Sequence, residues 1–149
     1  MKKFRVCKSF TFSAAHWLEN TALSQEEQKA IFGKCCGFRE ECDGRFPHGH
    51  TYKLEVVIEG VINPKTGMVI NFADIKKVVN EKVINYFDHK CLNLEVQPFS
   101  TGTITTAENM VSVIFDRLSL DWHGRDNTPK LVSVKVWEGP ESWAEITIP

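Results

Sequence analysis

With 149 residues and a formal net charge of −1, the chain fits a single domain over residues 1–149 and lacks the excess positive charge of a nucleic-acid-binding or membrane-surface protein. No apolar run is long enough to cross a membrane, and the polar start "MKKFRVCKSF" does not fit a signal peptide. Five cysteines, an odd number, then favour reduced thiols and a cytoplasmic location, with no nucleic-acid and no membrane partner.

Two long strands are predicted in the N-terminal part of the chain. Residues 4–16 alternate so that one face carries Phe4, Val6, Phe10, Phe12, Ala14 and finally His16. Residues 48–60 alternate in the same way, and their shared face carries His48, His50, Tyr52, Leu54, Val56 and Ile58. Between the strands, Ser24 and Glu27 stand at the spacing of a capping box and predict a short helix over residues 24–32. A loop rich in glycine, cysteine and charge then leads into the second strand.

The C-terminal part of the chain predicts two helices followed by two strands. Asn71 is positioned to cap the first helix, and Thr105 with Glu108 has capping-box spacing at the start of the second. Short strands follow in "LVSVKVWE" and "SWAEITIP". The resulting β-β-α-α-β-β order favours an α+β fold, with one antiparallel sheet and both helices on a single face. The exposed edges of such a sheet favour closure by oligomerisation.

The histidines of the two long strands predict a metal site. His48 and His50 are two residues apart in a strand, so their side chains point to the same side, about 7 Å apart along the strand. If the two strands pair antiparallel, His16 at the end of the first strand lies beside them. Three neutral imidazoles that leave one coordination position free are typical of catalytic zinc. Polar residues exposed to solvent at a strand end are the simpler interpretation of the same pattern.

Two further groups of residues could carry chemistry. Asp88 and His89 are adjacent in "FDHKCLN", where a carboxylate can orient an imidazole and raise its basicity. The same pair could instead only occupy the end of a helix, where a cationic histidine suits the helix dipole. Glu138 shares the strand parity of the valines before it, so it predicts an acceptor for the N–H groups of a ligand unless it lies past the strand end in water.

Seven short motifs, in this order along nearly the whole chain, resemble the 6-pyruvoyl-tetrahydropterin synthase family: "FSAAH", "FGKC", "HGHTY", "GMVINFADIK", "DHKCLN", "TTAEN" and "VKVWE". The sister 6-carboxy-tetrahydropterin synthases of queuosine biosynthesis belong to the same group. The resemblance implies a T-fold (tunnelling-fold) subunit that assembles into an oligomeric barrel, a homohexamer made of two trimers. It also implies a small-molecule pterin substrate, 7,8-dihydroneopterin triphosphate, and zinc as cofactor.

The roles that the resemblance implies fall on residues already singled out and on their neighbours. They are the zinc ligands His16, His48 and His50, the catalytic proton-relay residues Asp88 and His89, and the pterin-binding residues Thr106 and Glu138.

The catalytic cysteine is where the sequence departs from the family pattern, because the loop before "HGH" is longer and offers three thiols. Counting from "FGK" selects Cys35, whereas counting back from His48 selects Cys42. Because the base must work beside the metal, Cys42 is the predicted base and Cys35 the alternative. Glu40 and Glu41 add a third possibility, since some family members use a glutamate near this point and cleave the side chain instead.

The predicted activity is that of a zinc-dependent lyase that removes triphosphate from the substrate and moves protons along its side chain to form 6-pyruvoyl-tetrahydropterin. Zinc would acidify the side-chain hydroxyls, a thiolate would act as base, and Glu138 would pair with the donor edge of the pterin. A 6-carboxy or a 6-hydroxymethyl product, or a pterin-binding protein without catalysis, are the alternatives. The two remaining thiols, Cys7 and Cys91, are predicted to be core residues.

Overall fold

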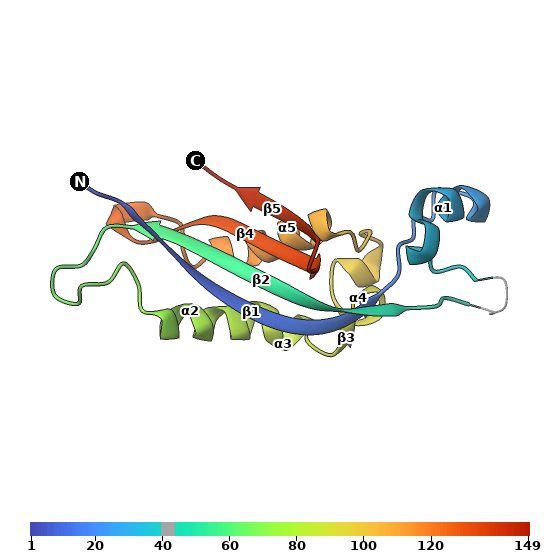
Figure 1. Ribbon diagram of the computed structural model, residues 1–149, viewed down its shortest axis with the longest axis horizontal. Coiled ribbons are helices and arrows are strands. Elements are labelled where there is room, and N and C mark those ends of the chain that lie inside the picture. The colour runs from blue at the N-terminus through green and yellow to red at the C-terminus, as the bar shows by residue number, and fades with distance from the viewer. Residues whose placement is uncertain (40–43) are drawn as a thin grey trace.

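The computed structural model describes residues 1–39 and 44–149 and contains one five-stranded sheet in the order β3-β1-β2-β4-β5. Figure 1 shows the long strands crossing the molecule diagonally, with α1 beyond one end of the sheet and both chain termini near the other. The strands are β1 (Phe4–His16), β2 (His48–Gly60), β3 (Lys90–Cys91), β4 (Lys130–Gly139) and β5 (Ser142–Thr147).

The two N-terminal strands have the predicted bounds and pair antiparallel along their whole length. Phe4 lies opposite Gly60 at one end of the pair, and His16 lies opposite His48 at the other. β4 pairs antiparallel with β2, and β5 pairs antiparallel with β4. Side chains of the predicted apolar parity are therefore gathered on one face of the sheet.

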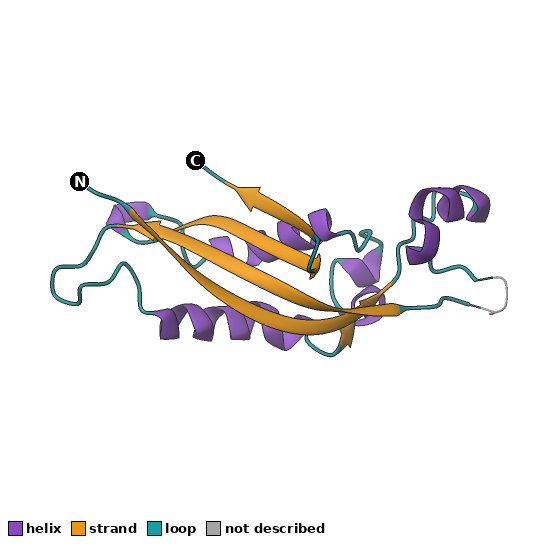
Figure 2. Ribbon diagram, in the orientation of Figure 1, coloured by secondary structure: helices purple, strands orange, loops and turns teal. Residues whose placement is uncertain are grey.

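Helices cover this apolar face (Figure 2). α2 (Phe72–Val79) runs on without a break through a π-helical segment, η2 (Asn80–Ile84), and the single turn α3 (Asn85–Phe87), while α5 (Ala107–Ser119) packs against β4 and β5. Buried residues of these helices and of β1, β2 and β4 form one apolar core. The short helices are α1 (Gln25–Phe32), η1 (Gly33–Cys35), α4 (Leu92–Glu95), η3 (Phe99–Thr101) and η4 (Arg125–Asn127). The prediction that two helices, here α2 with its continuation and α5, lie on one face of the sheet is confirmed.

The helix starts follow the expected capping chemistry at two of three positions. Ser24 and Glu27 form the predicted capping box of α1, and the Asn71 side chain accepts a hydrogen bond from the N–H of Ala73 at the start of α2. The predicted capping box of Thr105 and Glu108 is wrong by one residue. Thr106 is the cap of α5, because Thr105 is fully buried and uses its hydroxyl elsewhere.

The prediction of a purely antiparallel sheet is also wrong. β3 has only two residues and pairs in parallel with Ala14 and Ala15 at the end of β1, which makes the sheet mixed. A strand of two residues is too short to show an alternation of apolar and polar residues in the sequence. Its pairing depends on where the preceding helix ends. Within residues 1–39 and 44–149, none of the helices has the length and apolar character needed to cross a lipid bilayer.

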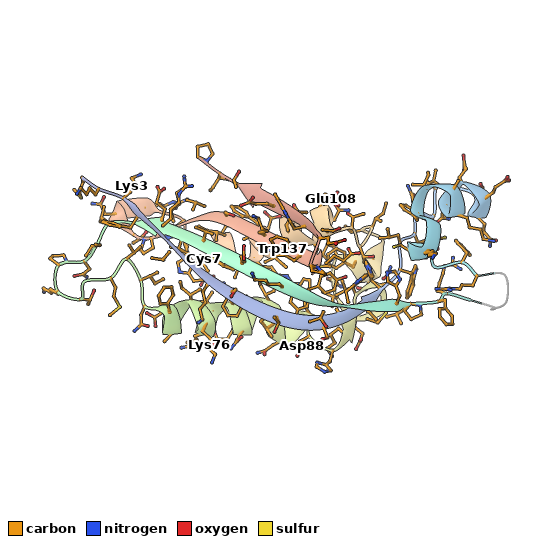
Figure 3. The ribbon with its side chains drawn as sticks, viewed as in Figure 1. Lys3, Cys7, Lys76, Asp88, Glu108 and Trp137 are labelled. Atoms are coloured by element: carbon orange, nitrogen blue, oxygen red, sulfur yellow. The ribbon has the colours of Figure 1, made fainter. Side chains whose placement is uncertain are left out.

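The other face of the sheet carries polar and charged side chains together with Cys7 and Trp137, which are labelled in Figure 3. Lys53 pairs with Glu55 along β2, and Lys135 on β4 lies 3.6 Å from Glu145 on β5. Cys7 is exposed on this face, so its prediction as a core thiol is wrong. Its odd position in β1 already separates it from the buried residues, which all have even numbers in that strand.

Candidate metal and active site

The antiparallel register of β1 and β2 brings the three predicted ligands together. His16 lies directly opposite His48, and His50 follows two residues later on the same face. The ring centroids are 4.6 Å apart for His16 and His48, 4.9 Å for His48 and His50, and 5.2 Å for His16 and His50. Each ring offers one nitrogen, and these three nitrogens lie within 4.8 Å of one another. The strand pairing alone therefore builds a three-imidazole cluster.

Thr105 fixes the orientation of His16, the most deeply buried of the three histidines. Nδ1 of His16 lies 2.9 Å from the carbonyl oxygen of Thr105, which can only accept, so this nitrogen carries the proton. The Thr105 hydroxyl in turn donates to the carbonyl of Trp17 at 2.7 Å. Burial, followed by the neighbouring His48, lowers the pKa of His16 to about 4. His16 is thus neutral near pH 7, with the lone pair of Nε2 directed at the cluster.

The donor set fits a divalent metal ion. The Nε2 atoms of all three histidines are buried and have no hydrogen-bond partner among the described residues. Burial, and then the neighbouring His50, lowers the pKa of His48, which favours the neutral form that can bind a metal. Buried polar atoms are normally paired, so three such nitrogens gathered in one cluster fit a shared metal ion. Neutral imidazoles in this number suit zinc with room for a further ligand.

Glu138 lies beside the cluster. Its Oε1 atom is 3.2 Å from Nε2 of His50, without the geometry of a hydrogen bond. Glu138 also acts on the thiol of Cys35, because burial first and then the charge of Glu138 raise the pKa of Cys35. Cys35 is held near this end of the sheet by its carbonyl, which accepts a hydrogen bond from the N–H of Leu18 at 2.8 Å. A carboxylate and a thiol therefore share the surroundings of the histidines.

Asp88 and His89 form the predicted carboxylate–imidazole pair. Nδ1 of His89 lies 3.0 Å from Oδ2 of Asp88, and the other carboxylate oxygen accepts a hydrogen bond from the N–H of Ser13. The Ser13 hydrogen bond, and then the one from His89, lowers the pKa of Asp88, so this carboxylate is ionised near pH 7. His89 has a φ of 57°, an uncommon conformation for a residue with a side chain, and its N–H donates to the carbonyl of Ser13.

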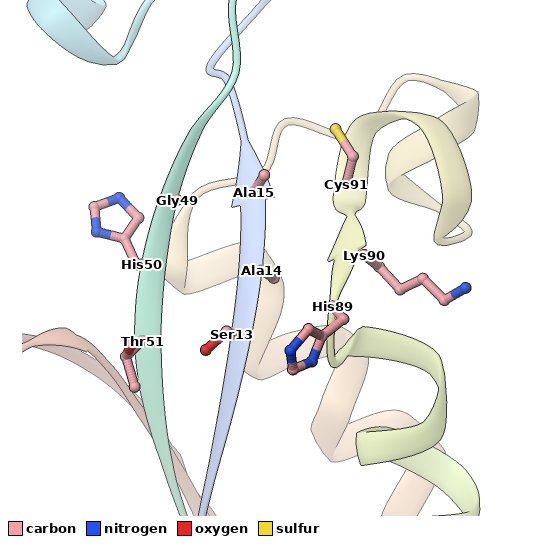
Figure 4. Close-up of a pocket in the computed structure, with 9 residues that line it drawn as sticks. All are labelled: Ser13, Ala14, Ala15, Gly49, His50, Thr51, His89, Lys90 and Cys91. Carbon is pink, nitrogen blue, oxygen red and sulfur yellow. The ribbon is translucent and has the colours of Figure 1, made fainter.

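Within one chain, this pair makes no direct contact with the histidine cluster among the described residues. Figure 4 shows His50 on the side of β2 that is remote from β1, whereas His89 lies beyond β1 next to β3. His89 and His50 nevertheless line the same pocket of about 500 Å³, together with the small residues Ser13, Ala15 and Gly49. Among the described residues, no hydrogen bond, ion pair or ring contact joins Asp88 or His89 to the three histidines.

The two remaining predicted site residues are Thr106 and Cys42. Thr106 is the cap of α5, where its hydroxyl accepts a hydrogen bond from the N–H of Asn109. It therefore lies next to Thr105, the residue that orients His16. Cys42, together with Glu40 and Glu41, falls outside the described residues, so its prediction as the base stays a prediction.

Three residues near the cluster were given no role in the site by the sequence. Thr105 orients His16, and Tyr52 has its ring 5.6 Å from that of His50. Asn93 clamps the end of β1, because its side-chain amide exchanges two hydrogen bonds with the backbone of Trp17, the residue after His16. Each lies inside a motif, in "TTAEN", "HGHTY" or "DHKCLN", but only the fold reveals what it contacts.

Comparisons with known proteins agree on one family. A family model described as 6-pyruvoyl tetrahydropterin synthase matches residues 5–149. The human 6-pyruvoyl tetrahydrobiopterin synthase is 40% identical over 114 residues, which cover 76% of this chain and 73% of that protein. The 6-carboxy-5,6,7,8-tetrahydropterin synthase of Haemophilus influenzae is 29% identical over 161 aligned positions, covering 95% and 97%.

A solved structure extends the agreement to three dimensions. The Caenorhabditis elegans 6-pyruvoyl tetrahydropterin synthase superposes with a TM-score of 0.82 at 30% sequence identity, covering 100% of this chain and 98% of that one. The match includes both histidine-bearing strands, since it spans the full chain. This chain therefore belongs to the 6-pyruvoyl tetrahydropterin synthase family.

Proposed function

We propose that the protein is a zinc-dependent lyase that converts 7,8-dihydroneopterin triphosphate to 6-pyruvoyl-tetrahydropterin with loss of triphosphate. The observation that carries this proposal is the cluster of three unpaired imidazole nitrogens beside the carboxylate of Glu138. Membership of the family, and relatives named as pterin synthases, support a pterin as the substrate. In this proposal the histidine cluster binds the reacting side chain of the substrate, and Glu138 binds its pterin ring.

His16, His48 and His50 would hold the zinc ion. When bound, zinc polarises the oxygens of a coordinated side chain and so favours loss of the neighbouring carbon-bound protons. The protein contributes the neutral state of its ligands, because the lowered pKa values of His16 and His48 keep both imidazoles unprotonated near pH 7. It also contributes orientation, since Thr105 sets which nitrogen of His16 is free.

Glu138 would bind the pterin ring. A carboxylate can accept two hydrogen bonds from adjacent N–H groups of a planar heterocycle, and an analogue that lacks those donors would leave it unpaired. Its present neighbour, Nε2 of His50, is one of the proposed metal ligands, so Glu138 is at the border between the metal and the ring. This position orients the pterin with its side chain toward the cluster.

A thiol would remove the proton from carbon. Cys35 is the candidate that the described residues support, because it lies within electrostatic range of Glu138 and its backbone is tied to Leu18 near the cluster. Cys42 is the prediction from counting back along the chain from His48. The thiolate of Cys35 would need the positive charge of bound zinc, since burial and Glu138 raise the pKa of Cys35 in the protein alone.

Two alanine variants separate the thiols. The variant that lacks the base should lose about 10²–10⁴-fold in kcat, as removal of a general base does, with zinc content unchanged. The other variant should turn over at the wild-type rate. If Cys35→Ala and Cys42→Ala both remain active, Glu40 and Glu41 become the candidates, and the product should shift toward the 6-hydroxymethyl compound.

We further propose that the active site is completed between subunits of a homohexamer built as a dimer of trimers. β3 pairs with only two residues of β1, so most of the outer edge of β1 can accept another strand, as can the outer edge of β5. β1 ends, and β5 begins, at the histidine end of the sheet. Antiparallel pairing of β1 with β5 of a neighbour would thus bring Asp88 and His89 toward the neighbour's Glu138.

Mixed assemblies test this arrangement. His48→Ala and His89→Ala should each be inactive alone, because one lacks a metal ligand and the other the imidazole of the proton relay. Co-expressed with different affinity tags and purified through both, they should recover part of the wild-type activity, since some sites then combine two intact halves. Complete absence of recovery in verified mixed oligomers would contradict a shared site.

Product analysis tests the reaction itself. Mass spectrometry of the zinc-loaded protein with 7,8-dihydroneopterin triphosphate should detect 6-pyruvoyl-tetrahydropterin and free triphosphate. A 6-carboxy product is the second candidate, because the match to the Haemophilus influenzae 6-carboxy enzyme covers nearly the whole of both chains. Tight pterin binding with no product of either kind would refute the lyase and favour a pterin-binding protein.

A further inference from the structure

Tyr52 occupies the floor of the histidine cluster. It follows His50 by two residues on β2, points to the same face, and is 0% exposed. Its ring stacks on Phe12 of β1, with centroids 5.0 Å apart and planes 16° apart. The ring also meets His50 edge-on at 5.6 Å and His16 at 6.3 Å. Tyr52 is therefore the point at which the apolar core touches the candidate metal site.

The hydroxyl group of Tyr52 has no hydrogen-bond partner in the part of the chain that the structure describes, although it is buried. A buried tyrosine O–H is normally paired, because leaving it unpaired costs the hydration that it had in water. Phenylalanine would fill the same space and stack on Phe12 without that cost. The packing of the ring therefore explains the aromatic side chain but not its oxygen.

Two acidic groups of the site act electrostatically on the hydroxyl of Tyr52. Burial is the main cause that raises the pKa of Tyr52, and the charges of Glu138 and then Cys35 raise it further. A phenol O–H can donate one hydrogen bond, so the buried group calls for an acceptor.

We propose that the hydroxyl of Tyr52 donates a hydrogen bond to a side-chain oxygen of the bound pterin, next to the histidine cluster, and stabilises the negative charge that develops there. This role rests on the proposed function and adds a catalytic residue to it. The donor is held rigidly by ring packing on three sides, so it needs no reorganisation when the charge forms. A ligand oxygen in the cluster would also supply the partner that the hydroxyl lacks in the protein alone.

The chain has two tyrosines, which gives a matched control. Tyr86 is exposed and lies beside Arg117, away from the histidines. In the zinc-loaded enzyme, Tyr52→Phe should lower kcat about 10²-fold, as loss of one donor to a developing oxyanion does, with zinc content and Tm unchanged. The effect should fall on kcat rather than KM, because the bond strengthens in the transition state. Tyr86→Phe should behave as wild type.

A second measurement reads the hydrogen bond without turnover. Tyrosine labelled with ¹³C at Cζ gives two resonances, which Tyr86→Phe assigns. Adding 7,8-dihydroneopterin, which has the substrate side chain without triphosphate, to the zinc-loaded protein should shift the Tyr52 resonance and leave that of Tyr86 in place.

Three results would overturn the role of Tyr52. They are a wild-type kcat for Tyr52→Phe, no shift on addition of 7,8-dihydroneopterin, or the full shift on addition of zinc alone. If the wild-type protein does not convert the triphosphate substrate at all, the proposed function fails, and the shift with 7,8-dihydroneopterin alone decides whether Tyr52 contacts a pterin.

Discussion

On the helix-covered face of the sheet, the two ends of the β1–β2 pair bury different kinds of side chain. At one end, Leu54, Val56 and Ile58 are 0% exposed and pack in the apolar core against the helices. At the other end, three imidazoles and the hydroxyl of Tyr52 present buried polar atoms without partners among the described residues. Backbone pairing is continuous across both ends, so the difference lies in side chains alone.

This contrast separates the source of stability from the source of chemistry. Each unpaired buried polar group costs about 1–3 kcal/mol, whereas each fully buried aliphatic side chain contributes about 1.5–3 kcal/mol. Burial of apolar side chains at the core end can therefore offset the free-energy cost of the unpaired groups at the histidine end, because the same two strands form both ends. Substitutions at the two ends should accordingly affect different measurements.

The largest effect is expected from His48→Ala at the histidine end. Removing one of three ligands should abolish turnover and release zinc, because two imidazoles hold the ion far more weakly. The Tm of the metal-free variant should match that of the metal-free wild type, since no apolar contact is lost. Metal analysis measures the zinc content, and calorimetry in the presence of a chelator measures the Tm of the metal-free proteins.

His123→Ala is the control for that variant, because His123 is exposed and not part of the cluster. It should keep both zinc and activity. Full zinc content in a triple variant of His16, His48 and His50 would refute the metal site.

At the core end, Leu54→Ala should act on stability. Loss of a fully buried leucine should lower the free energy of unfolding by about 2–5 kcal/mol, measured by denaturant titration. Zinc content per folded subunit should remain unchanged. Leu120→Ala, at a leucine that is 76% exposed, should change the same quantity by less than about 0.5 kcal/mol. Loss of zinc from folded Leu54→Ala would contradict the separation of the two ends.

The smallest effect is expected from Thr105→Val, which touches the histidine end indirectly. The variant keeps the carbonyl that binds Nδ1 of His16 but loses the hydroxyl that ties this segment to Trp17. Zinc affinity, measured by competition with a chelator, should fall about 10–100-fold, as it does when a group that orients a ligand is removed. Thr147→Val, on exposed β5, should leave the affinity unchanged, and an equal loss there would point to a general effect on stability.

Much of this arrangement could be predicted from sequence because alternation is a strong signal in long strands. The bounds of β1 and β2 and the shared face of His48 and His50 follow from it, and the antiparallel pairing that brings in His16 could be stated as a condition. The same parity predicts that Glu138 faces the core or a pocket, whereas its position beside His50 is a finding of the structure. Local capping chemistry likewise gave the starts of α1 and α2.

What could not be predicted depends on contacts between distant segments. Thr105 and Thr106 are chemically alike, and only the contacts of Thr105 with His16 and Trp17 in the folded chain decide which one caps the helix and which one holds His16. β3 is too short to show a pattern, and its parallel pairing carries Asp88 and His89 to the far side of β1. The unpaired hydroxyl of Tyr52 is invisible in a sequence, where the residue is one more large side chain on the buried parity.

The direct pairing of His16 with His48 has an evolutionary consequence. All three histidines belong to β1 and β2, whose register is set along the whole length of both strands, and the connection over residues 17–47 supplies none of them. Insertions or deletions in that connection alter its path but cannot shift one ligand past another. A lineage can thus lengthen this segment and exchange the thiols and glutamates within it while inheriting the three histidines intact. The candidate metal ligands stay with the strands, whatever the connection contains.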